Sequence, residues 1–386
     1  MSEPHEEAAF GSVAMPLSPE FRDGVRIKAT WSRHLLKGAR DVEALVARGL
    51  VLPEDALALT RVAERYEVLV SDYYLSLIDR DDPACPIRKQ AIPDKAELDE
   101  RPFELKDPIG DAAHTVAGIL VHRYPDRALL FPTFRCPMFC RYCFRKVALN
   151  DEPPRLREAL PEVLRYLNDH PEIEEIILSG GDPLMLADDL LDELLTQLRS
   201  VPSIRRLRLH TRFPVTLPMR VDGALAAMLA RHRPLYLVTH FNHPKEVTTE
   251  ARTAVKLLVD AGVTVLNQSV LLAEVNDDAV VLASLNTQLL DVQVRPYYLH
   301  HPDLTVGTSH FRVSLSRGLQ IVRALRGRLT GLAWPTYVLD IPGGLGKVPV
   351  DSDFVQRGLE PGHWFLRSPL TGAVVEYREP PDPRSK

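Results

Sequence analysis

The alternation of strand-like and helix-like segments between residues 128 and 326 is the feature that most constrains the fold. Strands are predicted at residues 128–134, 174–180, 205–212, 235–241, 264–272 and 293–301. Helices are predicted at residues 156–168, 190–198, 224–232, 248–261, 280–290 and 314–326. Serial strand–helix units indicate a parallel sheet, because parallel neighbours need a crossover that a helix fills. Eight units close an ordinary barrel, so these six predict an α/β fold with an incomplete, open (β/α)6 barrel. A doubly wound sheet is the alternative, and in either fold the chemistry collects at the carboxyl ends of the strands.

Three of the four cysteines lie on one short loop directly after the first predicted strand. Cys136, Cys140 and Cys143 follow the spacing CxxxCxxC. Three thiolates suit an iron–sulfur cluster with one open iron, since a closed zinc site or a fully ligated cluster needs a fourth ligand. The alternatives are unligated thiols and a zinc site completed by His210 or His240.

Composition limits the classes of partner. With 386 residues, 45% of them hydrophobic and 26% charged, the chain can bury a large core. A net charge of -5 gives no electrostatic argument for binding nucleic acid, and no apolar run approaches the length of a membrane span. The first twenty residues lack the apolar centre of a secretory signal. We therefore predict a cytoplasmic protein with reduced thiols, no nucleic-acid partner and no membrane partner.

The composition also changes along the chain, which predicts five segments. Residues 1–20 are expected to be a disordered N-terminus and residues 381–386 a flexible tail, since both ends are polar and contain proline. Residues 21–112 are predicted as a helical region, with one helix beginning at Pro53, followed by an irregular connector. Residues 113–330 form the α/β core, and residues 331–380 form a C-terminal segment.

A glycine-rich turn follows the second predicted strand. Its residues are Ser179, Gly180, Gly181 and Asp182. Two residues without a β-carbon let the main chain approach a ligand closely. Taken alone, the pattern is more often a tight turn whose aspartate caps the next helix. His240 and Gln268 lie on the fourth and fifth predicted strands, where a polar residue can also be satisfied internally.

A second glycine-rich loop, I-P-G-G-L-G-K, ends in Lys347. A lysine that forms an imine with a cofactor needs a mobile and locally shielded amine, which this loop would supply. A phosphate-binding loop or a surface turn explains the bare pattern equally well, although a Walker motif is absent. Asp340 precedes the loop among apolar residues, where an unpaired carboxylate is costly. An arginine of the chain or a substrate ammonium is its expected partner.

Three arginines and a second aspartate complete the candidates. Arg145, just after the cysteine loop, is either a surface charge or a carboxylate-binding group. Arg123 and Arg127 suit a phosphate near the lysine, although pairs with this spacing are often solvated. Asp303 follows a proline, where aspartate is ordinary in turns.

Together these motifs resemble the lysine 2,3-aminomutase family of radical S-adenosylmethionine (SAM) enzymes, over about residues 69–380. The resemblance is carried by the cysteine loop and by H-R-Y-P-D-R, L-S-G-G-D-P-L, T-H-F-N-H-P, L-N-Q-S-V-L-L, R-P-Y-Y-L and D-I-P-G-G-L-G-K. It implies an incomplete (β/α)6 barrel of the radical SAM type with an N-terminal helical extension. It also implies a C-terminal segment with a lysine that carries pyridoxal 5'-phosphate (PLP).

The resemblance further implies the site residues. The ligands of a 4Fe–4S cluster would be Cys136, Cys140 and Cys143. The catalytic residue would be Lys347, and the residues that hold PLP would be Lys347, Arg123, Tyr124 and Arg127. SAM would be bound by Ser179, Gly180, Gly181, Asp182, His240 and Gln268. The substrate carboxylate would be bound by Arg145, and its distal ammonium by Asp303 and Asp340.

The implied reaction interconverts L-lysine and β-lysine through hydrogen abstraction by a 5'-deoxyadenosyl radical and migration of the amino group. The implied partners are a small amino-acid substrate, a flavodoxin- or ferredoxin-type electron donor, and further copies of the chain in a homo-oligomer. Two aspartates would repel a side-chain carboxylate, which favours lysine over glutamate, while arginine stays open.

Two features of the sequence bear on alternatives within the family. The sequences C-R-Y-C-F-R and P-Y-Y-L-H also resemble shorter relatives that supply β-lysine for modification of elongation factor P. Some family members bind zinc through further cysteines, and this chain has none after Cys143, so we expect no zinc.

Overall fold

The computed structural model describes residues 30–150, 155–350, 354–360, 363–368 and 371–378. The expected disordered N-terminus (residues 1–20) and flexible tail (residues 381–386) lie outside these residues. The main feature is a nine-stranded sheet in which strand order follows chain order. Its strands are β1 (Leu120–Tyr124), β2 (Arg127–Thr133), β3 (Glu175–Gly180), β4 (Arg206–His210), β5 (Leu235–Thr239), β6 (Thr264–Val270), β7 (Arg295–His300), β8 (Thr336–Asp340) and β9 (Lys347–Pro349).

Strands β2 to β8 run parallel to one another, and the edge strands β1 and β9 pair antiparallel with β2 and β8. Among the described residues no pairing joins β1 to β9, so the sheet is open. The consecutive order β2 to β8 is that of a barrel, whereas the strand order of a doubly wound sheet reverses at one point. The predicted incomplete barrel is confirmed. Its six predicted strands are present, and β8 adds a further parallel strand.

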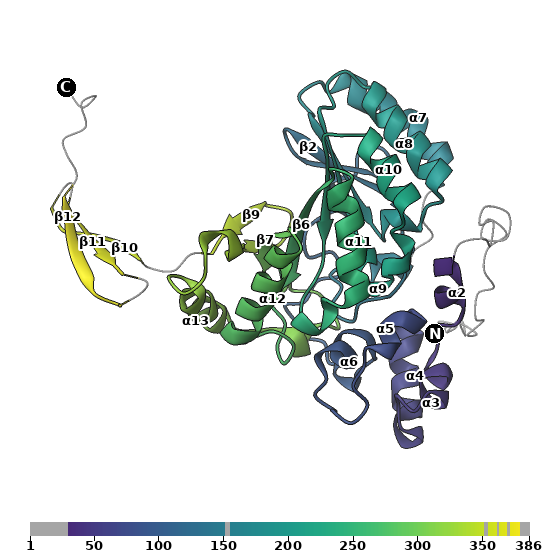
Figure 1. The fold of residues 1–386 in the computed structure, drawn as a ribbon, viewed down its shortest axis with the longest axis horizontal. Coiled ribbons are helices and arrows are strands. Elements are labelled where there is room, and N and C mark those ends of the chain that lie inside the picture. The colour runs from purple at the N-terminus through teal and green to yellow at the C-terminus, as the bar shows by residue number, and fades with distance from the viewer. Residues whose placement is uncertain (1–29, 151–154, 351–353, 361–362, 369–370, 379–386) are drawn as a thin grey trace, which may run out of the picture.

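The crossovers between parallel strands are helices on the outside of the sheet (Figure 1). They are α7 (Leu156–Asp169), α8 (Asp188–Ser200), α9 (Phe213–Thr216), α10 (Gly223–Arg231), α11 (Thr249–Asp260), α12 (Ala279–Asp291) and α13 (Leu315–Leu325). Helix α8 illustrates why they form. Four leucines at helical spacing, Leu191, Leu194, Leu195 and Leu198, are buried on one face. Acidic residues in its first turn and a basic residue in its last turn interact favourably with the helix dipole.

The N-terminal region is helical, as predicted, and packs on the barrel. Its elements are α2 (Thr30–Leu36), α3 (Val42–Ala47), a 3-10 turn η1 (Pro53–Asp55), α4 (Ala56–Arg65), α5 (Asp72–Ser76), α6 (Pro86–Ala91) and the 3-10 turns η2 (Lys95–Leu98) and η3 (Ala112–His114). The prediction of a wholly irregular connector was wrong, because α6 and η2 lie within it. Buried Ile87 and Ala91 of α6 join the main core, which fixes this short helix through packing.

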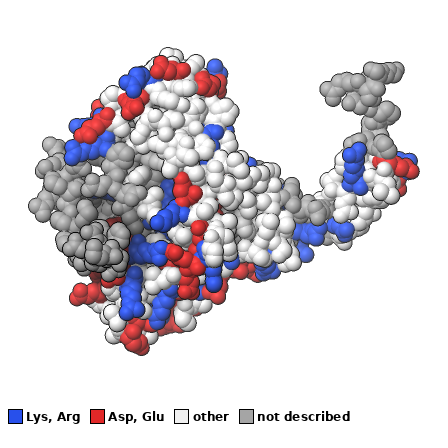
Figure 2. Space-filling view, turned by 180° about the vertical axis from the view of Figure 1, so that it is seen from behind, with Lys and Arg blue, Asp and Glu red and all other residues white. Residues whose placement is uncertain are grey.

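The C-terminal segment does not form one unit. Strands β8 and β9 belong to the main sheet, whereas β10 (Val355–Arg357), β11 (His363–Arg367) and β12 (Val374–Arg378) form a separate antiparallel sheet that projects from the body in Figure 1. Figure 2 shows acidic and basic side chains interspersed over one face of the body. None of the helices in the described residues has the length and apolar character required to cross a lipid bilayer.

Candidate functional site

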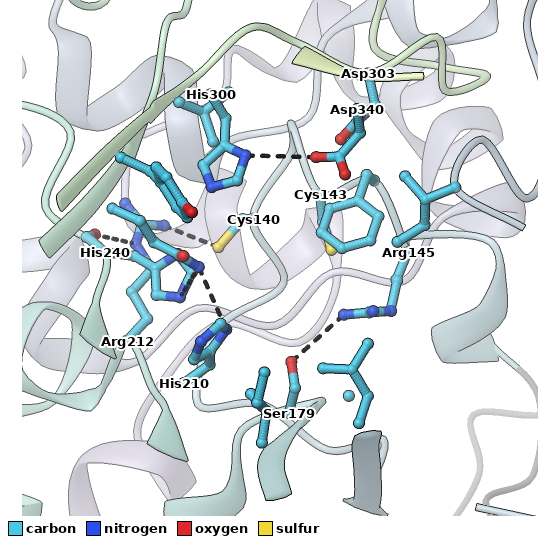
Figure 3. A pocket seen from close by; sticks show the side chains of 18 of the residues that line it. Cys140, Cys143, Arg145, Ser179, His210, Arg212, His240, His300, Asp303 and Asp340 are labelled. Atoms are coloured by element: carbon cyan, nitrogen blue, oxygen red, sulfur yellow. Dashed lines mark hydrogen bonds and ion pairs between the residues drawn. The ribbon is translucent and has the colours of Figure 1, made fainter. Parts of the chain in front are cut away.

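A cavity of about 710 Å³ lies at the carboxyl ends of the parallel strands (Figure 3). Every candidate residue named from the sequence lines it, from the cysteine loop after β2 to the lysine that begins β9. In particular, the three cysteines and Lys347 face one shared space although about 200 residues separate them in the sequence. The strand–helix repeat brings them together, because each parallel strand delivers its following loop to the same edge.

The cysteine loop is held by backbone hydrogen bonds from the N-terminal region. Phe139 N donates to Leu69 O at 2.8 Å, and Arg141 N donates to the carbonyl oxygen of Gln90 on α6 at 3.0 Å. Within the loop, Cys143 N donates to Cys140 O at 3.0 Å. The helical extension therefore fixes the cysteine loop from outside the barrel.

A buried charge network holds the same loop through its side chains. Glu97 is fully buried and accepts hydrogen bonds from Arg141 Nε at 2.9 Å and from Lys146 Nζ at 2.8 Å. Arg141 and Lys146 are only 2% and 6% exposed, so the network has little access to water. Burial would raise the pKa of Glu97, but the charges of Arg141 and Lys146 outweigh it and hold this pKa below its usual value. No local pattern in the sequence indicates this network.

Burial also controls the thiols. It raises the pKa of Cys143 to about 11 and the pKa of Cys136 well above its usual value, with Asp182 and the neighbouring cysteines adding to the effect at Cys136. Thiols in this environment stay protonated at neutral pH unless a metal takes the place of the proton. Among the described side chains, no three His, Cys, Asp or Glu residues are close enough together to share a single metal ion. Three thiols on one loop, one of which accepts a hydrogen bond from a charged group, suit an iron–sulfur cluster.

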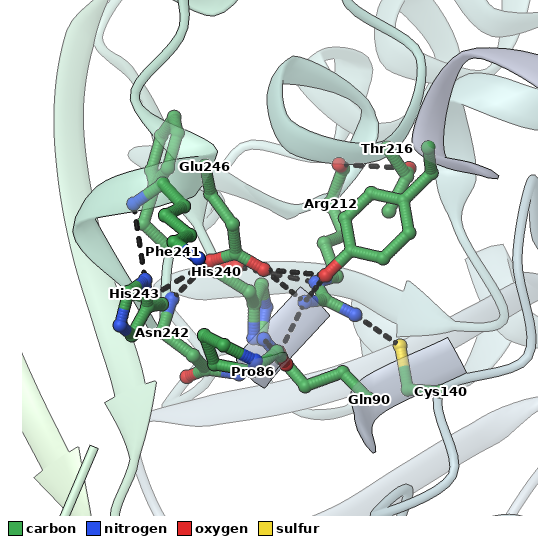
Figure 4. Close-up of polar contacts among 12 residues, drawn as sticks. Pro86, Gln90, Cys140, Arg212, Thr216, His240, Phe241, Asn242, His243 and Glu246 are labelled. Atoms are coloured by element: carbon green, nitrogen blue, oxygen red, sulfur yellow. Dashed lines mark hydrogen bonds and ion pairs between the residues drawn. The ribbon is translucent and has the colours of Figure 1, made fainter. Parts of the chain in front are cut away.

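That hydrogen bond comes from Arg212, which follows β4. Its Nη1 donates to Cys140 Sγ at 2.8 Å, and its Nη2 donates to Glu246 Oε1 at 2.8 Å (Figure 4). The sequence placed Arg212 at a strand end but assigned it no role. The contact between this buried arginine and Cys140 appears only in the folded structure, because the two residues are 72 positions apart in the sequence.

The glycine-rich turn after β3 packs tightly against the cysteine loop. A β-carbon on Gly181 would lie 2.5 Å from the carbonyl carbon of Phe134 and closer still to the oxygen of Arg135. Gly180 has φ +98°, a conformation that side chains with a β-carbon rarely adopt. The turn and the cysteine loop therefore pack backbone against backbone at this point.

Asp182 of this turn is used internally. Its carboxylate accepts hydrogen bonds from Thr211 Oγ1 at 2.7 Å, Arg212 N at 2.7 Å and Leu184 N at 3.0 Å. The last bond caps the 3-10 turn η5 (Pro183–Met185), which is the capping role weighed for this pattern in the sequence. Burial raises the pKa of Asp182 to about 6 against these bonds.

His240 and Gln268 meet in the cavity, as their strand positions predicted. Gln268 Nε2 lies 3.1 Å from His240 Nε2 and 3.5 Å from Nδ1 of His210. Burial lowers the pKa of His240 to about 3 and that of His210 well below its usual value, so both rings are neutral. The three side chains form a neutral polar surface suited to hydrogen bonding with a polar ligand.

Lys347 and Asp340 are paired directly across the β8–β9 hairpin. Their backbones are register partners, their side chains form an ion pair, and His300 Nδ1 lies 3.4 Å from Lys347 Nζ. Burial alone would raise the pKa of Asp340, but the His300 hydrogen bond and the Lys347 charge hold it at about 2. The expectation of an arginine partner for Asp340 was wrong, because Lys347 forms the ion pair with this carboxylate.

Asp303 is the second carboxylate on this side of the cavity (Figure 3). Burial, reinforced by the negative charge of Asp340, raises its pKa to about 7. The charges of Lys347, Arg145 and Arg123 compensate the buried carboxylate only in part, so a further cation placed beside Asp303 would stabilise its ionised form.

Arg145 lies near Ser179 in the same view, with its Nη1 3.4 Å from Ser179 Oγ. Its Nε donates to Asp111 Oδ2 at 2.8 Å, and the rings of Phe131 and Phe144 flank the guanidinium at 4.7 and 4.4 Å. These contacts hold the guanidinium plane in one orientation. Asp111 was not identified from the sequence, where it looked like part of a polar connector.

Arg123, Tyr124 and Arg127 line the cavity from β1 and the start of β2. Arg127 stacks over the Tyr124 ring at 3.9 Å, and Arg123 Nη1 donates to Ile109 O at 2.7 Å.

Several buried polar atoms around the cavity have no hydrogen-bond partner within the described part of the chain. They are Nε of Arg123, Nε2 of His210 and Nε2 of His300. Buried donors and acceptors are costly when unpaired, so their presence around one cavity indicates a polar ligand. These atoms and the nearby cations fit an anionic cofactor as well as a polar substrate.

Comparison with known proteins agrees with this geometry. Residues 130–283 match the Radical SAM superfamily. The chain is 38% identical over 353 residues to L-lysine 2,3-aminomutase of Clostridium subterminale, which covers 91% of this chain and 84% of that protein. It is 37% identical over 329 residues to L-lysine 2,3-aminomutase of Escherichia coli (strain K12), covering 85% and 96% of the two chains. It is 36% identical over 343 residues to glutamate 2,3-aminomutase of Clostridioides difficile (strain 630), covering 88% and 80%.

Proposed function

The chain belongs to the lysine 2,3-aminomutase family of radical SAM enzymes, and on this premise we propose that it interconverts L-lysine and β-lysine. Membership makes it an isomerase that uses a 4Fe–4S cluster and SAM, and it implies a small-molecule substrate and an electron donor. The choice of lysine, the use of PLP and the roles of individual residues are the proposal.

We assign the cofactors to three parts of the cavity wall. The cluster ligands are Cys136, Cys140 and Cys143. SAM lies against Ser179, Gly180, Gly181, His240 and Gln268, with Asp182 shaping the turn from behind. PLP is held by Lys347, Arg123, Tyr124 and Arg127. When bound, the cluster and SAM supply hydrogen-atom abstraction, and PLP supplies an electron-delocalising group that assists migration of the amino group.

The observation that carries the choice of lysine is the ion pair between Asp340 and Lys347. In this pair the Asp340 carboxylate already holds a primary ammonium, which is the group at the end of a lysine side chain. Asp303 adds a second buried carboxyl group, near enough for the Asp340 charge to raise its pKa. Two such groups favour a cationic side chain and repel the carboxylate of glutamate. Arg145, oriented by Asp111 and two phenyl rings, binds the substrate carboxylate.

The remaining side chains position the substrate and limit access of water. His240 is neutral because burial lowers its pKa to about 3, so it contributes hydrogen bonds without charge. Holding a substrate between a guanidinium and a carboxylate pair fixes which carbon faces the reactive groups. A partly enclosed cavity also protects reactive intermediates from solvent.

An anaerobic assay offering L-lysine, L-arginine and L-glutamate separately tests the choice of substrate. We expect a β-amino acid from lysine in the presence of SAM, PLP and reductant. Turnover of glutamate above lysine would contradict the charge argument. Asp340→Asn and Asp303→Asn should each raise KM for lysine, and lysine turnover that survives loss of both carboxylates would reject the ammonium site.

Lys347→Ala tests the proposed PLP attachment independently of turnover. We expect the variant to lose PLP that survives desalting, while its iron content stays that of the wild type. Lys256→Ala is the matched control, since Lys256 is an exposed lysine that pairs with Asp260 on its own helix. Retention of PLP by Lys347→Ala would remove the proposed role of Lys347.

The proposal extends to partners. A flavodoxin- or ferredoxin-type protein would deliver the electron, and the chain would form a homo-oligomer. Reduction of the cluster by each purified donor and light scattering of the full chain measure these two expectations.

A further inference from the structure

We propose that Arg212 sets the reduction potential of the cluster through its hydrogen bond to the Cys140 sulfur, and that Glu246 limits the size of this effect. The inference rests on the proposed cluster ligands and adds to them two residues that have no assigned part in the reaction. Arg212 acts through Cys140, so it is a positioning residue.

The geometry of the guanidinium supports this role. Arg212 Nη1 donates to Cys140 Sγ at 2.8 Å, and Nε donates to the carbonyl oxygen of His240 at 3.2 Å. The Arg212 side chain is 8% exposed, so its charge is little screened by water. A cation that donates a hydrogen bond to a sulfur ligand stabilises the more negative, reduced state of a cluster.

The carboxylate on the opposite side of the guanidinium is fully satisfied. Glu246 Oε1 accepts from Arg212 Nη2 at 2.8 Å and from Tyr74 OH at 2.7 Å, while Oε2 accepts from Asn242 N at 2.6 Å (Figure 4). Glu246 has no exposed surface. Its negative charge therefore opposes the effect of the guanidinium from a fixed position.

The N-terminal region fixes Arg212 in this position. Gln90 of α6 accepts from Arg212 Nη2 at 2.7 Å, and its backbone oxygen accepts from Arg141 N of the cysteine loop at 3.0 Å. Tyr74 of α5 lies 5.4 Å from the Arg212 guanidinium as a cation–π partner. These two helices thus hold the donor, and α6 also holds the loop that carries the acceptor.

If the Arg212–Glu246 pair had only a structural role, the expected effect of breaking it on the reduction potential would be different. An Arg212–Glu246 pair that only ties the N-terminal region to the barrel would change stability when broken and leave the potential unchanged. A pair that tunes the cluster must change the potential with opposite signs, because the two residues carry opposite charges.

The test is a redox titration of the anaerobically reconstituted full chain, followed by the electron paramagnetic resonance signal of the reduced cluster. Arg212→Met should make the cluster harder to reduce by about tenfold or more in the reduction equilibrium, equal to about 59 mV for a one-electron couple. Glu246→Gln should make it easier to reduce. Iron and sulfide are measured for each sample, so that only intact clusters are compared.

Arg220→Met is the matched control. Arg220 is also buried, at 3% exposed, and its side chain pairs with Asp188 and the Leu184 carbonyl oxygen instead of a cysteine. It should lose stability without a change in potential. If Arg212→Met binds no complete cluster, the shift in reduction potential of Glu246→Gln alone tests the inference.

The inference is overturned by intact clusters in Arg212→Met and Glu246→Gln that titrate at the wild-type potential, or that shift in the same direction. Such results leave the aminomutase assignment untouched. Failure of the wild-type chain to bind iron would instead refute the proposed ligands.

Discussion

Replacing Glu97 by glutamine should destabilise the protein strongly, because its carboxylate is paired with two buried cations. Arg141 and Lys146 both donate to Glu97, and none of the three side chains is more than 6% exposed. Breaking a buried pair typically costs about 3–5 kcal/mol, because the partner charge is left uncompensated. The Glu97→Gln variant would keep the side-chain volume and one acceptor, which isolates the effect of charge.

The expected decrease in the midpoint of thermal unfolding depends on the size of the chain. At about 2 °C per kcal/mol, the lower end for larger domains, the loss corresponds to a midpoint about 6–10 °C lower. Because the folded pKa of Glu97 lies below its ordinary value of 4.5, its contribution is present above that value and is lost as pH falls through the folded pKa. The difference between wild type and Glu97→Gln should therefore shrink as pH falls below about 4.5.

Differential scanning calorimetry at pH 7 measures the midpoint, with Glu162→Gln as the control. Glu162 is 55% exposed and faces Arg165 at 3.7 Å, so its loss should be nearly neutral. Adding Lys146→Met to Glu97→Gln should recover part of the lost stability, since it removes one unpaired buried cation. A Glu97→Gln midpoint within about 1 °C of the wild type would refute the reasoning, because the expected loss is several kcal/mol.

Three further predictions concern the cavity wall. Gly181→Ala should lower the iron content and the midpoint of thermal unfolding, since the added β-carbon would meet the backbone of the cysteine loop. Gly223→Ala is the control: its β-carbon would lie in open space, so neither quantity should change. The KM for lysine should rise up to about tenfold per pH unit below about 7, where Asp303 becomes protonated, and Asp303→Asn should abolish this slope. The charges facing Asp303 are Asp340, Lys347, Arg145 and Arg123. Asp111→Asn should raise the KM without altering iron content, because it loosens Arg145; an unchanged KM would contradict this orienting role.

The barrel could be predicted because its signal is local and repeated. Strands such as β3 are short apolar runs, and the helices carry apolar residues at helical spacing, as the four buried leucines of α8 illustrate. The edge strand β1 escaped prediction, since three of its five residues, His122, Arg123 and Tyr124, are polar or amphipathic. Its pairing depends on the tight connection to β2, with Tyr124 opposite Arg127.

The candidate residues could be collected from the sequence because loops after parallel strands converge. Their electrostatic partners could not. Glu97 and Arg141 are 44 residues apart, and Arg212 and Cys140 are 72 apart, so no local pattern distinguishes them from solvated charges. Lys347 is the partner of Asp340 because the hairpin pairs them, and the sequence alone does not give that register.

The register of the β8–β9 hairpin determines the direction in which the Lys347 side chain points. Lys347 faces the cavity because it is opposite Asp340 in an antiparallel ladder, where successive side chains point to alternate faces. Inserting or deleting a single residue in the six-residue connection 341–346 would shift the ladder by one step and turn the amine to the opposite face of the sheet. The length of this connection therefore determines which side chain of β9 faces the cavity.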